Sequence, residues 1–109
     1  MSGLPVVPRE RARQDVEDAI AFYVAQGADQ VALGFIDALE AAFDTVGAHP
    51  AIGASRWGEE LELPGLRSWS LAEYPFAVFY VVRADHVDVW RVLHLRRDLP
   101  TTLGVPEGD

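Results

Sequence analysis

The chain has 109 residues, of which nine are basic and 17 are acidic, and its formal net charge is -8. A chain of this length forms one domain, so we expect a single domain over residues 1–109. Half of its residues are hydrophobic, which is typical of a folded chain and not of a disordered one. The basic residues are all arginine, and an acidic surface without lysine disfavours direct binding to nucleic acid. No cysteine is present, so disulfides and cysteine-based zinc sites are excluded.

The first half of the chain predicts a short strand and a helical hairpin. Residues 4–7 form a brief apolar stretch, and Pro8 suits the first turn of a helix that extends to about Gln26. Asp29 suits the N-cap of a second helix, which Gly47 ends. Two helices joined by about three residues are expected to pack antiparallel. The apolar residues at helical spacing are Ala12, Val16, Ala19, Ile20 and Tyr23, then Ala32, Phe35, Ile36, Leu39, Phe43 and Val46.

The second half predicts a long connection and three strands. Glycine, proline and glutamate fill residues 47–65, which indicates a surface connection with a short extended piece at 60–63. Strands are expected at 66–72, 76–82 and 87–95, and the last becomes apolar on both faces, as a central strand does. From about residue 101 we expect a loose tail.

The predicted order of elements is therefore β-α-α-β-β-β. A helical hairpin that precedes a strand meander favours an α+β fold, in which the helices pack on one face of a small, mostly antiparallel sheet. The other face needs a cover, and a partner chain is one candidate for it.

Several segments form a pattern over about residues 4–100. Its most specific part is Leu63-Pro64-Gly65-Leu66-Arg67, followed about thirty residues later by Arg91-Val92-Leu93-His94-x-x-Arg97-Asp98. The other matching positions are Ala12, Asp15, Tyr23, Phe35, Leu39, Phe43, the segment 49–53 and Phe76-x-x-Phe79-Tyr80. Together these residues resemble the ParE/RelE superfamily of toxins from type II toxin–antitoxin modules, and the ParE branch in particular.

This resemblance implies a compact toxin and a cognate antitoxin. A ParD-like antitoxin would have a ribbon-helix-helix N-terminal half that dimerises and binds operator DNA, and a C-terminal segment that wraps the toxin. The toxin would thus meet DNA only indirectly. For a ParE-like member the resemblance implies inhibition of DNA gyrase without catalysis, whereas a RelE-like member would cleave mRNA on the ribosome.

The residues available for chemistry favour the ParE branch. Cleavage of RNA needs a base, an acid and cations around the phosphate. RelE-like toxins carry several lysines and often a late tyrosine, whereas this chain has no lysine and no tyrosine after His94. If the chain is nevertheless a ribonuclease, the catalytic candidates are His94, Arg97 and Arg67. The candidates for binding the target are Arg91, His94, Arg96 and Arg97.

Structural roles compete with these functional ones. A histidine in an apolar strand, such as His94, is more often a structural residue than a base, and Arg67 is a candidate anchor for the connection 47–65. A third alternative to gyrase inhibitor and ribonuclease is a decayed toxin that only binds its antitoxin. The candidates for an antitoxin groove are Phe76, Phe79, Tyr80 and Trp90, and periodicity alone does not assign them to one face.

No other class of site is indicated. No two of the three histidines have the spacing of metal ligands, and no glycine-rich phosphate loop is present, so we expect neither a metal nor a cofactor. The longest apolar run, Phe76–Val82, is far shorter than the ~20 residues that span a bilayer. The N-terminus lacks the apolar core of a secretion signal. We therefore expect a cytoplasmic protein without membrane contacts.

Overall fold

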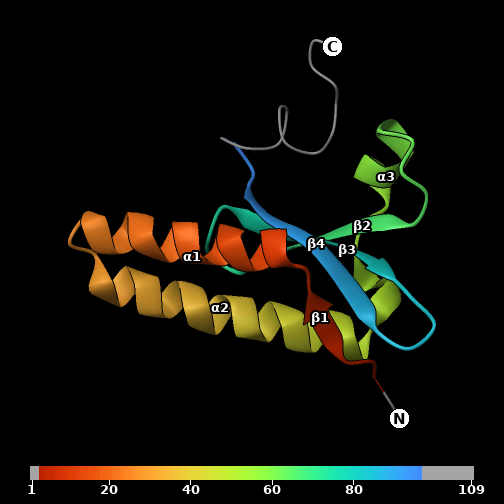
Figure 1. The fold of residues 1–109 in the computed structure, drawn as a ribbon, viewed down its shortest axis with the longest axis horizontal. Coiled ribbons are helices and arrows are strands. Elements are labelled where there is room, and N and C mark those ends of the chain that lie inside the picture. The colour runs from red at the N-terminus through yellow and green to blue at the C-terminus, as the bar shows by residue number, and fades with distance from the viewer. Residues whose placement is uncertain (1–2, 97–109) are drawn as a thin grey trace.

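A computed structural model describes residues 3–96 as two long helices beside a four-stranded sheet (Figure 1). This arrangement confirms the predicted α+β fold and the order β-α-α-β-β-β, into which two short helices are inserted. The tail predicted from about residue 101 lies outside the described residues. The elements are β1 (Val6–Pro8), α1 (Glu10–Ala25), α2 (Asp29–Ala48), the 3-10 helix η1 (Pro50–Ile52), α3 (Arg56–Glu60), β2 (Leu66–Ser70), β3 (Phe76–Val82) and β4 (Val87–His94).

The strands lie in the order β1-β4-β3-β2. β1 runs parallel to β4, while β4, β3 and β2 pair antiparallel, so the sheet is mostly antiparallel as expected. β4 lies between two neighbours, and its residues belong to the cores on both faces of the sheet, which is why its sequence is apolar on both faces. Opposite β3, the register shifts between Phe79 and Tyr80, and Trp90 of β4 is the residue left without a direct partner.

The helical hairpin follows the apolar spacing of its sequence. The buried residues of α1 are Ala12 and Ala19. The helix ends before Gly27, which takes a left-handed φ of 73° at no steric cost. The expected N-cap of the second helix is wrong by one position. Ala28 holds the N-cap, and Asp29 is the first helical residue, where its charge favours the helix dipole.

The connection between the hairpin and the sheet differs from its prediction. No extended piece forms at residues 60–63, because α3 occupies Arg56–Glu60 and the chain then turns at Glu62, whose φ is 56°. Trp57 and Leu61 of this segment pack against the face of the sheet that the long helices leave open. A helix of five residues depends on such tertiary packing, which its own periodicity does not reveal.

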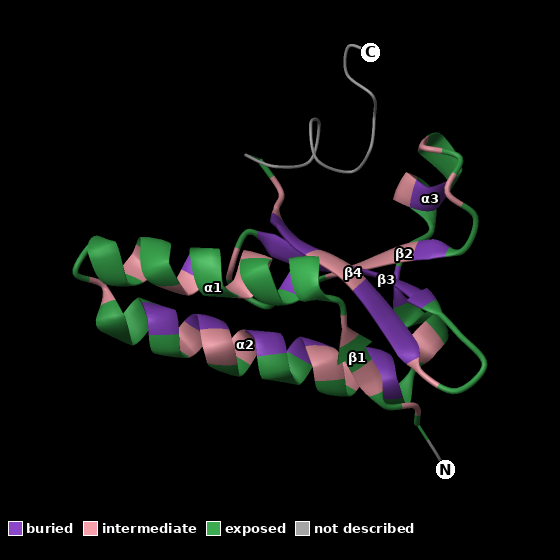
Figure 2. Ribbon diagram, in the orientation of Figure 1, coloured by how far each residue is buried: buried purple, intermediate pink, exposed green. Residues whose placement is uncertain are grey.

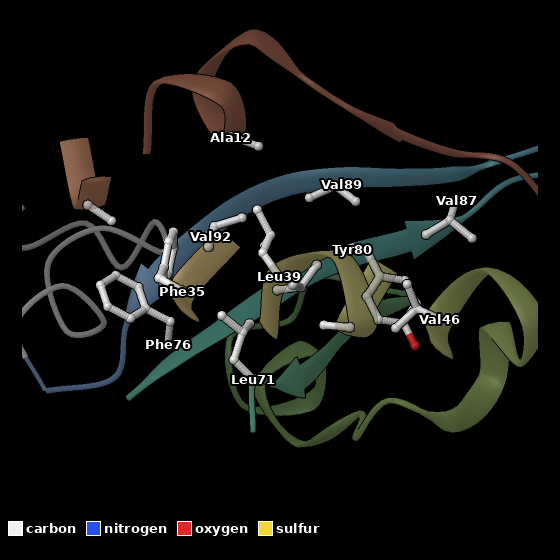
Figure 3. Packing of buried hydrophobic residues seen from close by; sticks show 13 residues of the cluster. Ala12, Phe35, Leu39, Val46, Leu71, Phe76, Tyr80, Val87, Val89 and Val92 are labelled. Carbon is white, nitrogen blue, oxygen red and sulfur yellow. The ribbon is translucent and has the colours of Figure 1, made fainter. Parts of the chain in front are cut away.

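The sheet is thus buried on both faces, and Figure 2 shows β3 and β4 as mostly buried ribbon. Alternate residues of β3 belong to two cores. Phe76, Val78 and Tyr80 join the main core under α1 and α2. The main core gathers around Phe35, Leu39, Val46, Leu71 and Val92 (Figure 3). The second core, on the other face, contains Leu66, Ala77, Phe79, Val81 and Leu93, with Trp57, Leu61, Leu63, Trp90 and Leu95 packed against it.

No described helix is both long and apolar enough to cross a membrane.

Candidate partner-binding surface

Arg67 and Tyr80 hold the segment that follows the helical hairpin. Arg67 donates from Nη1 to the carbonyl oxygens of Ala51 and Gly53, at 3.1 and 2.7 Å. The Tyr80 hydroxyl accepts from the Gly53 N–H at 2.9 Å and donates to the Pro50 carbonyl at 2.8 Å. Arg67 therefore anchors the connection, which was one of the two roles predicted for it.

The Tyr80 hydroxyl remains a donor at neutral pH. Burial raises the pKa of this hydroxyl, and it outweighs the opposing effects of the Gly53 hydrogen bond and the Arg67 charge. The side chain is 0% exposed, so its two hydrogen bonds satisfy a polar atom that water cannot reach. Tyr80 and Arg67 together fix the backbone of residues 50–53 to the sheet.

Arg91 joins α1 to β4. Its Nε and Nη2 both donate to the carboxylate of Asp15, at 2.8 Å each, and the Val92 N–H donates to the same carboxylate at 3.0 Å. The Arg91 and Asp15 side chains are 17% and 12% exposed. A bidentate pair of this kind is strong and directional. Arg91, a predicted target-binding residue, is thus held against α1 instead of facing solvent.

His94 lies at the end of β4 in a largely structural setting. Its ring meets the Phe76 ring edge-on, with the centroids 5.1 Å apart, and its Nδ1 accepts from the Arg96 N–H at 3.1 Å. Arg96 is exposed, whereas Arg97 lies outside the described residues. Of the three target-binding candidates within residues 3–96, Arg91, His94 and Arg96, only Arg96 is exposed.

Arg67 and His94, the two ribonuclease candidates within residues 3–96, lie at separate places on the sheet. Arg67 lies opposite Tyr80 on β3, and His94 lies opposite Phe76. Along the strand direction the two registers are four residues apart, roughly 13 Å at about 3.3 Å per residue, and β3 lies between the two strands that carry Arg67 and His94. The third candidate, Arg97, is outside the described residues. Within residues 3–96, no group of histidines and acids forms a metal site either.

The predicted antitoxin-groove residues are mostly buried by the chain itself. Phe76 and Tyr80 lie under the long helices, and Phe79 lies in the second core, all at 3% exposure or less. Each would need the fold to open before it could contact a partner. Trp90 alone among the four is partly exposed. The sequence of β3 did not reveal this burial, because both faces of the strand are covered and nearly every residue in it is apolar.

A groove does lie on the second face, between α3 and the sheet. Its volume is about 590 Å³. It runs beside β2, an edge strand whose outer side pairs with Ala54 only at Ser68. No sequence pattern pointed to this groove, because the packing of α3 creates it. Residues that line the groove include Ile52, Ala54, Trp57, Ser68, Ala77 and Leu95.

Asp88 organises a second polar cluster that the sequence analysis missed. The residue is buried, and its carboxylate accepts from Arg9 at 3.0 and 2.9 Å, from Arg83 at 3.0 and 2.9 Å, and from the Trp90 Nε1–H at 3.2 Å. Burial tends to raise the pKa of Asp88, but the bonds from Arg9, Arg83 and Trp90 outweigh it and lower the pKa to about 2. The signal was an acid inside an apolar central strand, where a charge needs partners.

Comparison with known proteins gives two findings. Residues 6–99 match the profile of the family described as "ParE toxin of type II toxin-antitoxin system, parDE". The fold is similar to a solved structure described as "Chromosomal ParDE TA system from P. aeruginosa", with a TM-score of 0.69 and 20% identity over 84% of this chain and 96% of that chain. At this identity the likeness concerns the fold. No curated protein matches the chain.

Proposed function

Because the chain belongs to the ParE family of type II toxin–antitoxin toxins, we propose that it arrests growth by inhibiting DNA gyrase and that a cognate antitoxin neutralises it. The family match over residues 6–99 carries the proposal. The proposed action takes place in the cytoplasm, on gyrase itself, and the chain approaches DNA only through its partners. The formal charge of -8 agrees with a protein target more than with a nucleic acid.

The arrangement of the polar residues supports gyrase inhibition over cleavage of mRNA. Arg67 holds a loop, Arg91 holds a helix, and His94 lies far along the sheet from Arg67. A nuclease needs its acid, base and cations around one phosphate. Residues 3–96 do not supply that grouping.

The purified toxin tests this proposal directly. We expect it to block supercoiling of relaxed plasmid by gyrase and to leave mRNA intact on translating ribosomes. Normal supercoiling together with cleaved mRNA would instead establish the ribonuclease. Expression without the antitoxin supplies the third comparison, since a decayed toxin that only binds its antitoxin would leave growth unaffected.

We assign the antitoxin segment to the groove between α3 and the sheet. Most of the side chains that line the groove are apolar, with Arg56, Ser68 and Ser70 as the polar ones, and the neighbouring β2 edge carries backbone groups that an added strand could pair with. An amphipathic helix would bury the same apolar side chains. A stable complex of this kind typically buries about 1,200 Å² or more, so the segment would extend beyond the groove.

A glutamate placed in the groove tests this assignment. Ile52 lines the groove and is 42% exposed, so Ile52→Glu changes its surface without filling a core. We expect the affinity for the antitoxin to fall at least tenfold by calorimetry, because the charge must be desolvated on binding. Leu33→Glu is the matched control, since Leu33 is 55% exposed on α2, away from the groove. Equal affinities for the two variants would place the antitoxin elsewhere.

A further inference from the structure

The Asp88 cluster presents two arginines to solvent at one edge of the molecule. Arg9 precedes α1, Arg83 follows β3, and both converge on Asp88 of β4. The carboxylate is 9% exposed, whereas the Arg9 and Arg83 side chains are 51% and 43% exposed. Two guanidinium groups share one carboxylate, so the cluster keeps a net positive charge in a chain whose total is -8.

Each guanidinium retains donors for a ligand. The bonds to Asp88 run through Nε and Nη2 of both arginines, which leaves the Nη1 edges without a partner in the described part of the chain. Guanidinium groups favour oxyanions with planar geometry. A second carboxylate bound to these Nη1 groups would pair with both arginines and neutralise the positive charge that Asp88 leaves uncompensated.

Trp90 gives the same place an apolar surface. Its indole donates to Asp88 and lies 4.9 Å beneath the Arg9 guanidinium, and the residue is only partly buried. These contacts hold the three side chains in place before any ligand arrives. Binding therefore immobilises few additional rotamers, which favours affinity.

We propose that Arg9, Arg83 and Trp90 bind an acidic side chain of a partner protein, with an apolar residue of the same segment on the Trp90 ring. A single carboxylate fits the single excess charge of the cluster, whereas a nucleic acid would be repelled by the acidic remainder of the chain.

The antitoxin is the partner that supplies this acidic side chain, an assignment that rests on the proposed function. Trp90 packs on the same core as Trp57 and Leu95, which line the groove. A segment in the groove thus lies on the same face as the arginine pair.

A peptide titration tests the site without any named partner. The probe is acetyl-Leu-Glu-Leu-amide, followed by the ¹⁵N shifts of the Arg9 and Arg83 Nε–H and the Trp90 Nε1–H. We expect all three signals to move, and Arg83→Gln to weaken the binding at least fivefold. Asp88 keeps Arg9 in that variant, so the fold is retained. The matched control is Arg13→Gln, at an exposed position on α1.

Three results of this titration would overturn the site. Signals that stay in place would show that the arginines do not bind the carboxylate. Equal shifts with inorganic phosphate at the same concentration would indicate a general anion site without selection for protein. If Arg13→Gln weakened peptide binding as much as Arg83→Gln, the binding would depend on the overall charge and not on this site.

The antitoxin supplies the second measurement. We expect Arg83→Gln to lower its affinity at least tenfold at 50 mM salt and to reduce the salt dependence of binding, while Arg13→Gln leaves both unchanged. If Arg83→Gln weakened gyrase inhibition but not antitoxin binding, the assignment to the antitoxin would be overturned. A wild-type chain that left gyrase unaffected while both measurements succeeded would support the site and refute only the proposed target.

Discussion

At the scale of single residues, several polar side chains that look functional by residue type make hydrogen bonds within the fold instead. Tyr80 is 0% exposed, yet it carries a hydroxyl, and a buried hydroxyl without partners costs about 1–3 kcal/mol. The Gly53 N–H and the Pro50 carbonyl remove that cost. Arg91 is a similar case, because Asp15 satisfies two of its donors. Both side chains are thus occupied by contacts within the fold.

Removing the Tyr80 hydroxyl tests its role. We expect Tyr80→Phe to lower the free energy of unfolding by about 1–3 kcal/mol, because the Gly53 N–H and the Pro50 carbonyl lose their partner. Urea denaturation followed by fluorescence measures the change. Tyr74→Phe is the control, since its hydroxyl donates to the Val31 carbonyl at an exposed site, where water can replace it. A loss as large in Tyr74→Phe would contradict the argument from burial.

Asp15 and Arg91 give a second test at this scale. Asp15→Asn leaves the Arg91 guanidinium, 17% exposed, without its countercharge. Breaking such a pair from one side is strongly destabilising, so we expect a loss of about 3 kcal/mol in urea denaturation. Asp18→Asn is the comparison on the same helix, because Asp18 is exposed and accepts a hydrogen bond from Gln14 one turn away. Similar stabilities for the two variants would show that the Arg91 pair contributes little.

At the scale of elements, α3 makes the groove and yet depends on the sheet for its own stability. Five residues are too few for an independent helix. Trp57 and Leu61 pack against the second core, and the bridge between Ala54 and Ser68 fixes the start of the segment to β2. The residues that bury the second face of the sheet thus also build one wall of the groove.

We expect Trp57→Ala to release α3 while the rest of the sheet persists. Amide hydrogen exchange in residues 54–63 should accelerate by at least tenfold, because these amides are protected through the packing of α3. Exchange in β3 should stay slow, since its other face remains covered by the main core. Trp57→Phe, which keeps an aromatic ring, should restore most of the protection. Faster exchange across β3 as well would mean that α3 and the main core open as one unit.

At the scale of the whole molecule, a few charged contacts tie together distant parts of the chain. Asp88 in the central strand binds Arg9, 79 residues away, and Arg83 at the end of β3. It thereby links β1 and α1 to the β3–β4 hairpin. Because its pKa is lowered to about 2 in the folded state, this contact contributes to stability only when Asp88 is ionised.

The sign of the pH dependence follows from that lowered pKa. The contribution is complete above the unfolded pKa of about 3.9 and is lost as pH falls towards 2. With half-exposed arginines as partners, we expect it to be worth about 1–2 kcal/mol. Unfolding free energies at pH 6 and pH 2.5 should therefore differ more for the wild type than for Asp88→Asn. Equal pH dependence in the two proteins would mean that Asp88 does not govern acid stability.

The sequence by itself determined the order of the elements and the α+β class, because the spacing of apolar residues within a short segment distinguishes a strand from a helix. Its motifs indicated the family. For Arg67 the sequence offered two roles, an anchor of the connection or a catalytic residue, and the hydrogen bonds to Ala51 and Gly53 show the anchoring role. The tertiary structure decided which side chains remain available. Arg91 is taken up by Asp15, 76 residues away, and Phe79 by the second core, while Arg9, Arg83 and Trp90 meet at Asp88. The bonds of Arg91 to Asp15 and of Arg9 to Asp88 join residues 76 and 79 positions apart, which leave no local pattern, so only the folded chain shows which groups face a partner.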